Sequence, residues 1–182
     1  MRIETERLIL RPWEDRDRLP LRAILGDSQV RRFYPAPATA EESDRLIEHS
    51  NAEAAVHGFH FQAVEHRRDG VLLGMMGLAP MSQVMQAATG GKVEIGWQLN
   101  ARYWGQGLAP EGACAWLDHA WHRLDLDEVV AFTAAINRPS RRVMEKIGMD
   151  HDPATDFAHP RLPDGHALRP HVLYRLRNPL RR

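Results

Sequence analysis

The chain has 182 residues, of which 43% are hydrophobic, and this is enough apolar material for one domain with a buried core. Lysine plus arginine and aspartate plus glutamate each number 24, so no net charge favours a nucleic acid or an anionic membrane as partner. A single cysteine, with no N-terminal apolar segment and no long apolar run, is typical of a soluble cytoplasmic protein without disulfides.

The first half of the chain predicts strands and helices that end at glycine or proline. Leucines alternate with other residues in TERLILRPW, which indicates a strand. Thr39 and Glu42 have capping-box spacing at the start of a polar helix. An Asp-Gly pair indicates a hairpin turn. The expected order is strand, helix, helix, strand and strand, over residues 5–11, 15–25, 39–58, 59–65 and 71–78.

Residues 93–121 combine three signals in a row. Large apolar residues alternate from Val93 to Leu99, so one face of a strand is buried and Glu94 faces the other way. Gly105 and Gly107 then bracket a turn, and a helix follows. The apolar stripe of this helix comprises Ala113, Trp116, Leu117, Ala120, Trp121 and Leu124. Free N–H groups and the positive end of the dipole at this helix start predict an anion site, with a pyrophosphate as the preferred ligand.

The remaining segments are two loops and further regular elements. Residues 79–91 form a long connection, for which we consider a functional loop and a disordered hairpin tip. Residues 151–170 carry four prolines and predict an ordered loop or weak strand. Cys114 falls between apolar neighbours on the helix and is interpreted as a small core residue. The remaining expected elements are a strand, a helix capped by Asn137 and a last strand, over residues 128–133, 137–148 and 171–177.

Four separated motifs resemble the GNAT N-acetyltransferases, and within that superfamily the ribosomal-protein N-terminal acetyltransferases. The motifs span residues 5–149 in the family's order and are TERLILRPW, EIGWQL, WGQGLAPEG and NRPSRRVMEKIGM. The resemblance implies an α/β fold, here one domain over residues 1–182, with a mixed, mostly antiparallel sheet. That sheet would splay between its fourth and fifth strands, carry helices on both faces and bind acetyl-CoA in the gap. The implied enzyme is an acetyl-CoA-dependent N-acetyltransferase.

The resemblance also implies cofactor-binding residues. The family's phosphate motif falls on Trp104 to Ala109, where Trp104 replaces the usual Gln or Arg. Gln98 and Leu99 would pair with the pantetheine amides, and the Asn137 side chain would contact the cofactor. Arg142, with Arg102 and Arg141, flanks the predicted phosphate site and is either a ligand of the 3′-phosphate or a solvated arginine. The implied phosphate-loop set is Trp104, Gly105, Gln106, Gly107, Leu108 and Ala109.

Two residues are candidates for catalysis. An amine attacks a thioester only when unprotonated, so a base must remove a proton, and Glu94 beside the expected splay is the candidate. The alternative for Glu94 is a strand carboxylate paired with an arginine. Ser140, at the start of a helix, is either the acid or coenzyme-sulfur contact implied by the resemblance, or a capping residue.

The acceptor is expected to be a primary amine, either a peptide N-terminal α-amine or a small molecule such as an antibiotic, polyamine or metabolite. Asp156 and His159 are candidates to orient it, with an Asp-led turn as the alternative. No metal is expected, because His119 and His122 lack a third ligand at a matching spacing. Direct transfer in a ternary complex, no nucleic-acid or membrane partner, and a monomer or homodimer are expected.

Two other classes of protein remain as rivals. One is a module that senses acetyl-CoA without turnover. The other is an RNA-associated protein that uses the C-terminal arginines, which zero net charge argues against. These arginines are Arg169, Arg175, Arg177, Arg181 and Arg182.

Overall fold

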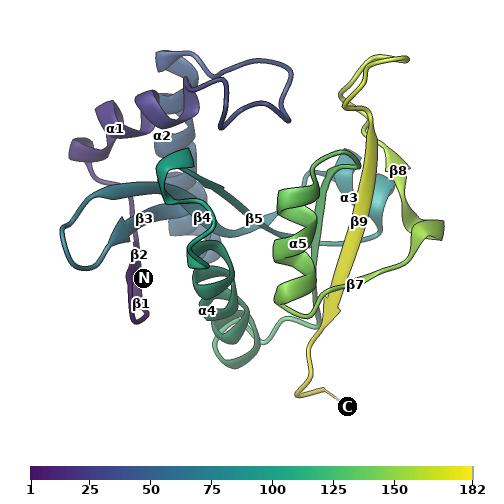
Figure 1. The fold of residues 1–182 in the computed structure, drawn as a ribbon. Coiled ribbons are helices and arrows are strands. Elements are labelled where there is room, and N and C mark those ends of the chain that lie inside the picture. The colour runs from purple at the N-terminus through teal and green to yellow at the C-terminus, as the bar shows by residue number, and fades with distance from the viewer. Residues whose placement is uncertain (182) are drawn as a thin grey trace. The chain divides into compact units, whose positions relative to one another are not determined.

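The computed structural model describes residues 1–181 and has an α/β architecture with a mixed sheet (Figure 1). The strands are β1 Ile3–Glu4, β2 Leu8–Arg11, β3 Gln62–His66, β4 Leu72–Pro80, β5 Val93–Leu99, β6 Glu128–Ala134, β7 Asp150–His151, β8 Phe157–Ala158 and β9 Pro170–Arg177. The helices are α1 Arg18–Leu25, α2 Ala40–His57, α3 Gln83–Thr89, α4 Leu108–His122 and α5 Arg138–Lys146, and short 3-10 turns cover Asp15–Asp17, Ala101–Tyr103 and Pro153–Thr155.

The chain forms two compact units. Unit 1 comprises Met1–Leu78 and Gly96–Trp116, and unit 2 comprises Ala79–Ile95 and Leu117–Arg182. In unit 1 the strand order is β1-β2-β3-β4-β5, and in unit 2 it is β5-β6-β9-β7 with β8 beside β9. The pairs β1–β2, β2–β3, β3–β4, β6–β9, β7–β9 and β8–β9 are antiparallel, whereas β5 and β6 are parallel. The predicted mixed, mostly antiparallel sheet is therefore confirmed.

The sheet of unit 1 is covered by helices on both faces. Side chains of α1 and α2, among them Leu21 and Ile47, pack with Ala63 and Met75 on one face. On the other face Gly112 of α4 lies so close to β2 and β4 that a Cβ there would meet the sulfur of Met76 at 2.8 Å. Arg11 joins α1 to the sheet, because its buried guanidinium holds both carboxylate oxygens of Asp17 at 2.7 and 2.8 Å.

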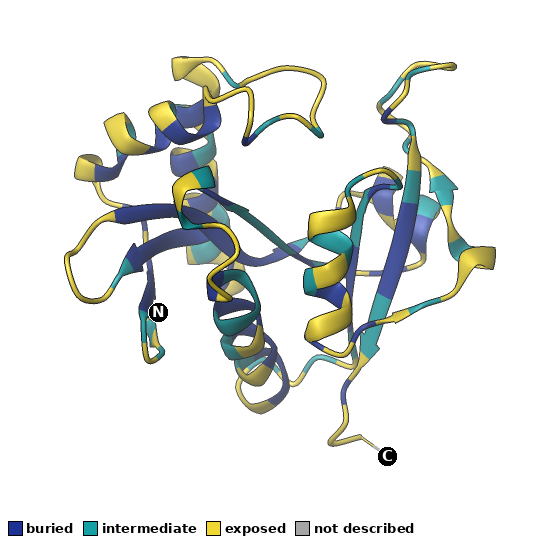
Figure 2. Cartoon of the chain, viewed as in Figure 1, coloured by how far each residue is buried: buried dark blue, intermediate teal, exposed yellow. Residues whose placement is uncertain are grey.

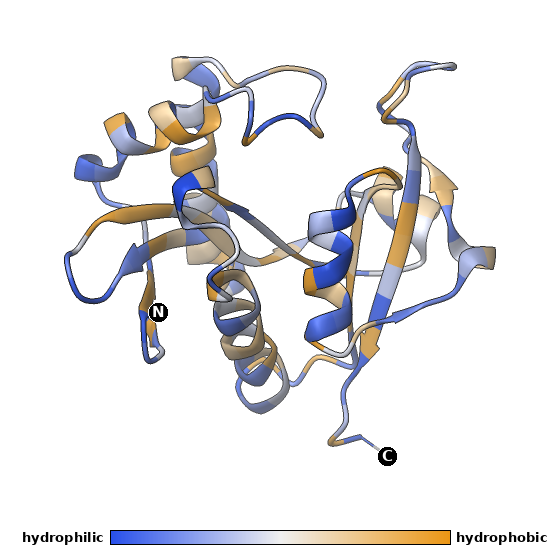
Figure 3. Ribbon diagram, viewed as in Figure 1, coloured by the Kyte–Doolittle hydropathy of each residue, from blue (hydrophilic) through white to orange (hydrophobic). Residues whose placement is uncertain are grey.

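Unit 2 also carries a helix on each face of its strands. Met81 and Met85, before and within α3, pack with Val130 and Leu173 on one face. On the opposite face the hydroxyl of Tyr174 donates to Glu145 of α5 at 3.1 Å. Figure 2 shows β9 buried along its middle, and Figure 3 shows that α5 is largely hydrophilic. Because β9 has apolar residues on both faces, both α3 and α5 are needed to bury them.

Several predicted element boundaries are confirmed at the level of hydrogen bonds. Thr39 is the N-cap of α2, and its side chain and that of Glu42 form the predicted capping box. Gly58 ends the helix with φ 81°. The predicted first strand is shorter than residues 5–11, since only Leu8–Arg11 form a strand and Thr5 to Arg7 form a turn between β1 and β2. The predicted loop over 151–170 is an ordered segment with the two short strands β7 and β8 at its start.

Three sequence interpretations are wrong. Residues 79–91 are not a disordered hairpin tip or a connection without regular structure, because they contain α3, which begins after Ser82 and ends at Gly90 with φ 70°. Cys114 is exposed, since it follows Ala113 and is turned by about 100° away from the buried stripe of α4. Leu124, expected on that stripe, lies beyond the end of α4.

None of the helices within residues 1–181 combines the length and apolar character needed to cross a membrane.

Three of the C-terminal arginines named above pair with acids: Arg169 with Asp164, Arg175 with Glu128 and Arg181 with Asp125. Arg182 lies outside the described residues. This neutralisation argues against an arginine surface for RNA.

Candidate active site

The loop between β5 and α4 has the geometry expected of an anion site. Gly105 and Gly107 adopt φ 76° and 78°, a conformation that side chains with a Cβ rarely adopt. The hydrogen bonds of residues 1–181 include none donated by the backbone N–H groups of Gln106, Gly107, Leu108 and Ala109. No side chain within residues 1–181 caps these amides, so they are able to bind an oxyanion.

Thr5 and Arg7, in the turn after β1, hold this loop and the first turn of α4 through hydrogen bonds. Arg7 Nη1 donates to the carbonyl of Gln106 at 2.8 Å, and its Nε donates to Oε2 of Glu111, in the first turn of α4, at 2.6 Å. Oε1 of Glu111 accepts from the Thr5 hydroxyl at 2.5 Å and from the Arg7 backbone N–H at 2.9 Å. Burial alone would raise the pKa of Glu111, but these hydrogen bonds hold it below its usual value.

The Trp104 side chain serves the loop as a support. Its indole Nε1 donates to the Leu99 carbonyl at 2.7 Å, and the guanidinium of Arg32 lies over its ring at 4.8 Å. The carbonyl of Leu99 therefore already has a protein partner. Gln98 Oε1, in contrast, is buried and has no hydrogen-bond partner within the described chain. A buried amide oxygen without a donor fits the pairing with a pantetheine amide that the sequence resemblance implied.

Glu94 lies in unit 2, in register with Val130 on the parallel strand β6. Side chains in register on neighbouring strands project to the same face, and Val130 packs there against Met81, Met85 and Leu173. Burial of the carboxyl group raises the pKa of Glu94 to about 7, although the positive charge of Arg161 opposes the shift. A carboxyl group with this pKa is matched to accepting a proton near neutral pH.

The start of α5 separates the roles of Asn137 and Ser140. Asn137 is the N-cap: its Oδ1 accepts from the Ser140 backbone N–H at 3.3 Å, and its Nδ2 donates to the Thr133 hydroxyl at 2.8 Å. The capping interpretation of Ser140 is therefore wrong, and no hydrogen bond of the Ser140 hydroxyl occurs in the described part of the chain. Arg142 on the same helix is exposed, whereas Arg141 donates to the Ala135 carbonyl and to Tyr174.

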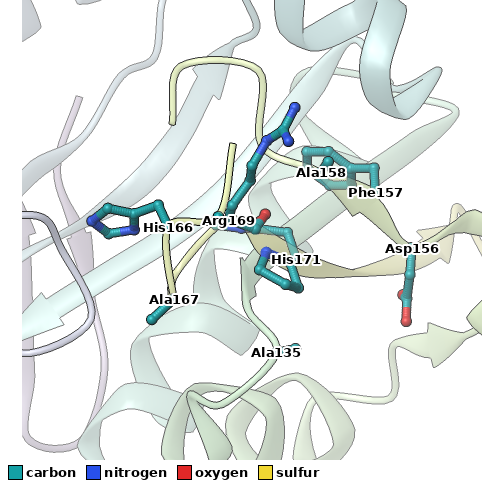
Figure 4. Close-up of a pocket in the computed structure, with 10 residues that line it drawn as sticks. Ala135, Asp156, Phe157, Ala158, His166, Ala167, Arg169 and His171 are labelled. Atoms are coloured by element: carbon teal, nitrogen blue, oxygen red, sulfur yellow. Dashed lines mark hydrogen bonds between the residues drawn. The ribbon is translucent and has the colours of Figure 1, made fainter. Parts of the chain in front are cut away.

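A pocket of about 620 Å³ lies beside the start of β9 in unit 2. Figure 4 shows His166, Arg169 and His171 around it, with Ala135 at the end of β6. The backbone of Leu168 donates to His166 Nδ1 at 3.1 Å, and His171 Nδ1 lies 3.1 Å from the Arg169 carbonyl and donates to it. Burial lowers the pKa of His171 to about 4, so this imidazole is neutral at pH 7. The lining residues are Ala135, Asp156, Phe157, Ala158, Gly165, His166, Ala167, Arg169, Pro170 and His171.

The predicted acceptor residues differ in their relation to this pocket. Asp156 belongs to its lining, and its Oδ1 accepts from the Leu173 backbone N–H at 3.2 Å and from His151 Nε2 at 2.9 Å. His159 lies beside the lining residue His171, with ring centroids 4.7 Å apart. Burial and the charge of Arg161 lower the pKa of His159. Asp156 does not lead the turn that served as the alternative, because its Oδ1 accepts from Leu173 and His151; such a turn occurs instead at Asp152, which accepts from the Ala154 backbone N–H.

The candidate residues thus divide between the units: Gln98, Leu99 and Trp104 to Ala109 lie in unit 1, and the others lie in unit 2. Sequence reasoning missed Arg7 and Glu111, which are 104 positions apart and have no shared local pattern. It also missed Arg161, whose Nη2 donates to the Ser82 hydroxyl at 3.1 Å and links the loop before β9 to the start of α3. Only Ser82, a typical N-cap residue before helix-forming neighbours, gave a local signal.

Comparison with known proteins identifies the family. The family model described as an acetyltransferase (GNAT) domain matches residues 7–150. The uncharacterised N-acetyltransferase YnaD of Bacillus subtilis (strain 168) is 31% identical over 150 residues, which cover 82% of each chain.

Solved structures agree with this family. An acetyltransferase (GNAT family) from Bacillus anthracis superposes with a TM-score of 0.80 at 26% identity, covering 98% of this chain and 99% of that one. RimL, a ribosomal L7/L12 alpha-N-protein acetyltransferase in complex with coenzyme A, shares the fold with a TM-score of 0.76 at 14% identity, covering 97% and 98%. The chain is therefore an acetyl-CoA-dependent N-acetyltransferase, and it belongs to the GNAT family of acetyltransferases.

Proposed function

We propose that the chain transfers the acetyl group of acetyl-CoA directly to a primary amine while both are bound. The observation that carries this proposal is the set of unpaired backbone N–H groups from Gln106 to Ala109, at a helix start and beside two glycines with positive φ. Such a set binds a diphosphate without a metal ion or a charged side chain. Acetyl-CoA supplies the activated acyl group and a thiol leaving group.

Further residues would hold other parts of the co-substrate. The orphaned Oε1 of Gln98 would accept from an amide of the pantetheine arm. The Leu99 backbone and the Asn137 side chain, both already bonded within the protein, contribute less in this proposal. Exposed Arg142 would pair with the 3′-phosphate.

Glu94 would act as the general base. An α-amine has a pKa near 8 and a lysine amine one near 10.4 in water, so most acceptor molecules arrive protonated. A carboxylate whose pKa is about 7 accepts this proton, directly or through a water, at the pH where the enzyme works. His171, with a pKa of about 4, is too weak a base to compete.

Ser140 would donate a hydrogen bond to the departing thiolate. Because Asn137 caps α5, the Ser140 hydroxyl is not required to complete the helix start. A donor directed at the sulfur stabilises the negative charge that develops there during transfer.

For the acceptor, a peptide N-terminal α-amine is the first candidate, in line with the neighbour RimL, which is described as an alpha-N-protein acetyltransferase. We propose the pocket beside β9 as the acceptor site. Oδ2 of Asp156 accepts no hydrogen bond from residues 1–181, so it would pair with the ammonium group before deprotonation. His159 would support the pocket through its contact with His171.

A small-molecule amine is the second candidate. The pocket volume of about 620 Å³ lies within the range of small-ligand sites, roughly 300–1,000 Å³. A screen of thiol release from acetyl-CoA separates the two candidates. It should include peptides with a free N-terminus, the same peptides with a formylated N-terminus, polyamines and aminoglycosides. Release with free peptides alone supports the first candidate, release with small amines alone supports the second, and no release with any amine contradicts catalysis.

Binding of acetyl-CoA tests the phosphate site itself. Gly107→Glu puts a carboxylate beside the amides that would bind the diphosphate, whereas Gly107→Gln introduces the same backbone strain and bulk without the charge. We expect the Glu variant to bind acetyl-CoA at least about tenfold more weakly than the Gln variant in calorimetry, because a like charge opposes the ligand. Gly70→Glu, at another glycine with positive φ and open space around it, serves as the control. Equal affinities of the Glu and Gln variants would refute the phosphate assignment.

A further inference from the structure

Arg7 lies directly behind the candidate phosphate loop, although nothing in the sequence connects it with that loop. Its Nη1 donates to the carbonyl of Gln106 at 2.8 Å, and Nε and Nη2 each lie 2.6 Å from Oε2 of Glu111. The guanidinium thus bridges the peptide between Gln106 and Gly107 and the first turn of α4. A Cβ on Gly107 would lie 3.6 Å from Nη2, so the arginine is in contact with this peptide along its side.

This contact fixes the direction of a neighbouring N–H group. In a planar trans peptide the C=O of one residue and the N–H of the next point in opposite directions. Because the Gln106 carbonyl points at Arg7, the N–H of Gly107 points away from Arg7 and Glu111. Gly107 has φ 78°, and glycine has access to conformations on both sides of the φ map, so the loop needs such an external constraint to keep one orientation.

Arg7 also compensates a negative charge. Glu111 is largely buried, with 17% of its side chain exposed, and its hydrogen bonds keep it ionised at neutral pH. A carboxylate in the first turn of α4 stabilises the helix but would repel a diphosphate at the same helix start. The Arg7 guanidinium, whose Nε and Nη2 both lie against Oε2, neutralises that carboxylate at close range.

We infer that Arg7 is a positioning residue for the phosphate loop: by holding the Gln106 carbonyl and neutralising Glu111, it presents the Gly107 N–H to a diphosphate. This inference rests on the proposed phosphate site. The side chain of Arg7, which lies in the turn after β1, is 40% exposed and is held by Glu111 of α4. Arg7 therefore acts through the peptide between Gln106 and Gly107 and does not contact the reacting atoms.

Two acetyl donors test the inference. Acetyl-CoA carries the diphosphate, whereas S-acetylpantetheine carries the same thioester and pantetheine arm without any phosphate. In Arg7→Met the KM for acetyl-CoA should rise about 10- to 100-fold, which corresponds to the loss of hydrogen bonds to a charged group. The kcat/KM for S-acetylpantetheine should change by less than about twofold, because that donor makes no contact with the phosphate loop.

Two further variants control this experiment. Arg67→Met removes an arginine that donates to the carbonyl of Thr5, in the turn that also contains Arg7, at 3.0 Å but does not contact the phosphate loop. This variant should leave the kinetic constants for both donors unchanged. Arg7→Met/Glu111→Gln leaves no unpaired carboxylate and therefore protects the fold. It should show the same selective loss with acetyl-CoA, because the Gln106 carbonyl is still not held.

The outcomes distinguish the inference from the function on which it rests. Equal losses with both donors would assign Arg7 a merely structural role, and an unchanged KM for acetyl-CoA in Arg7→Met would also overturn the inference, while leaving the phosphate site intact. A wild-type enzyme that uses both donors with equal kcat/KM would instead refute the phosphate site, and the role of Arg7 with it.

Discussion

Oδ1 of Asn137 accepts a hydrogen bond from the backbone N–H of Ser140 at 3.3 Å, which makes Asn137 the cap of α5 and leaves the Ser140 hydroxyl outside the cap. The sequence offered both Asn137 and Ser140 as caps of this helix, and only Asn137 has that role. Loss of one should affect stability, and loss of the other should affect the reaction.

Ser140→Ala should lower kcat by about tenfold or more while leaving the free energy of unfolding within about 0.5 kcal/mol of wild type, since a thiolate donor is lost but no cap. Asn137→Ala is the matched variant and should cost about 1 kcal/mol of stability through loss of the cap. Steady-state kinetics and urea denaturation of both variants provide the measurements. A Ser140→Ala protein that is less stable and equally fast would reverse the assignment.

Glu94→Gln should remove the acidic limb of the pH–rate profile. In the wild type, kcat/KM should rise with pH up to about 7, where the carboxyl group becomes deprotonated and able to accept a proton. The variant should be slower by about 10²- to 10⁴-fold and lack this inflection. Rates measured from pH 5.5 to 9 with one acceptor are sufficient. An undiminished rate across this range would exclude Glu94 from the mechanism.

The same carboxyl group should make the folded protein less stable as pH rises. Its pKa is about 7 in the folded state and about 4.5 when exposed, so the native state binds more protons between these values and the free energy of unfolding falls through pH 4.5–7. The loss attributable to Glu94 is on the order of 3 kcal/mol. Glu94→Gln should therefore be more stable than wild type at pH 8, with the difference absent at pH 4. A difference that does not depend on pH would contradict the buried-carboxyl interpretation.

Two buried histidines should give the opposite dependence. Burial lowers the pKa of His60 and of His171 to about 4, below the value of 6.5 in the unfolded chain. The unfolded state then binds more protons between pH 4 and 6.5, so stability is complete above pH 6.5 and is lost as pH falls through this window.

Each of these histidines should account for about one proton taken up on unfolding at pH 5. His171→Phe keeps an aromatic ring against Phe132 and Phe157 and should reduce that uptake by about one, as should His60→Phe. The slope of unfolding free energy against pH, from urea titrations at several pH values, measures the uptake. An unchanged slope in both variants would show that neither histidine is held neutral.

Local chemistry within the sequence determined the elements whose signals lie within a few residues. The capping box at Thr39, the glycine end at Gly58, the alternation of Val93 to Leu99 and the cap at Asn137 each depend on backbone groups that are neighbours in the chain. The two glycines of the phosphate loop belong to the same class, because their positive φ is a property of the residue itself. The helix α3 was also encoded locally, by Ser82 and Gly90, but the length of the connection hid it.

Tertiary structure alone decided which side chains support the candidate site. Arg7 contacts Gln106 and Glu111 across about a hundred residues, and Arg161 contacts Ser82 across 79 positions. The pKa of Glu94 likewise depends on burial, and on the charge of Arg161, both of which arise only in the folded chain. Hydrogen bonding over such separations and desolvation depend on where distant segments meet, and no spacing pattern within one segment records that position.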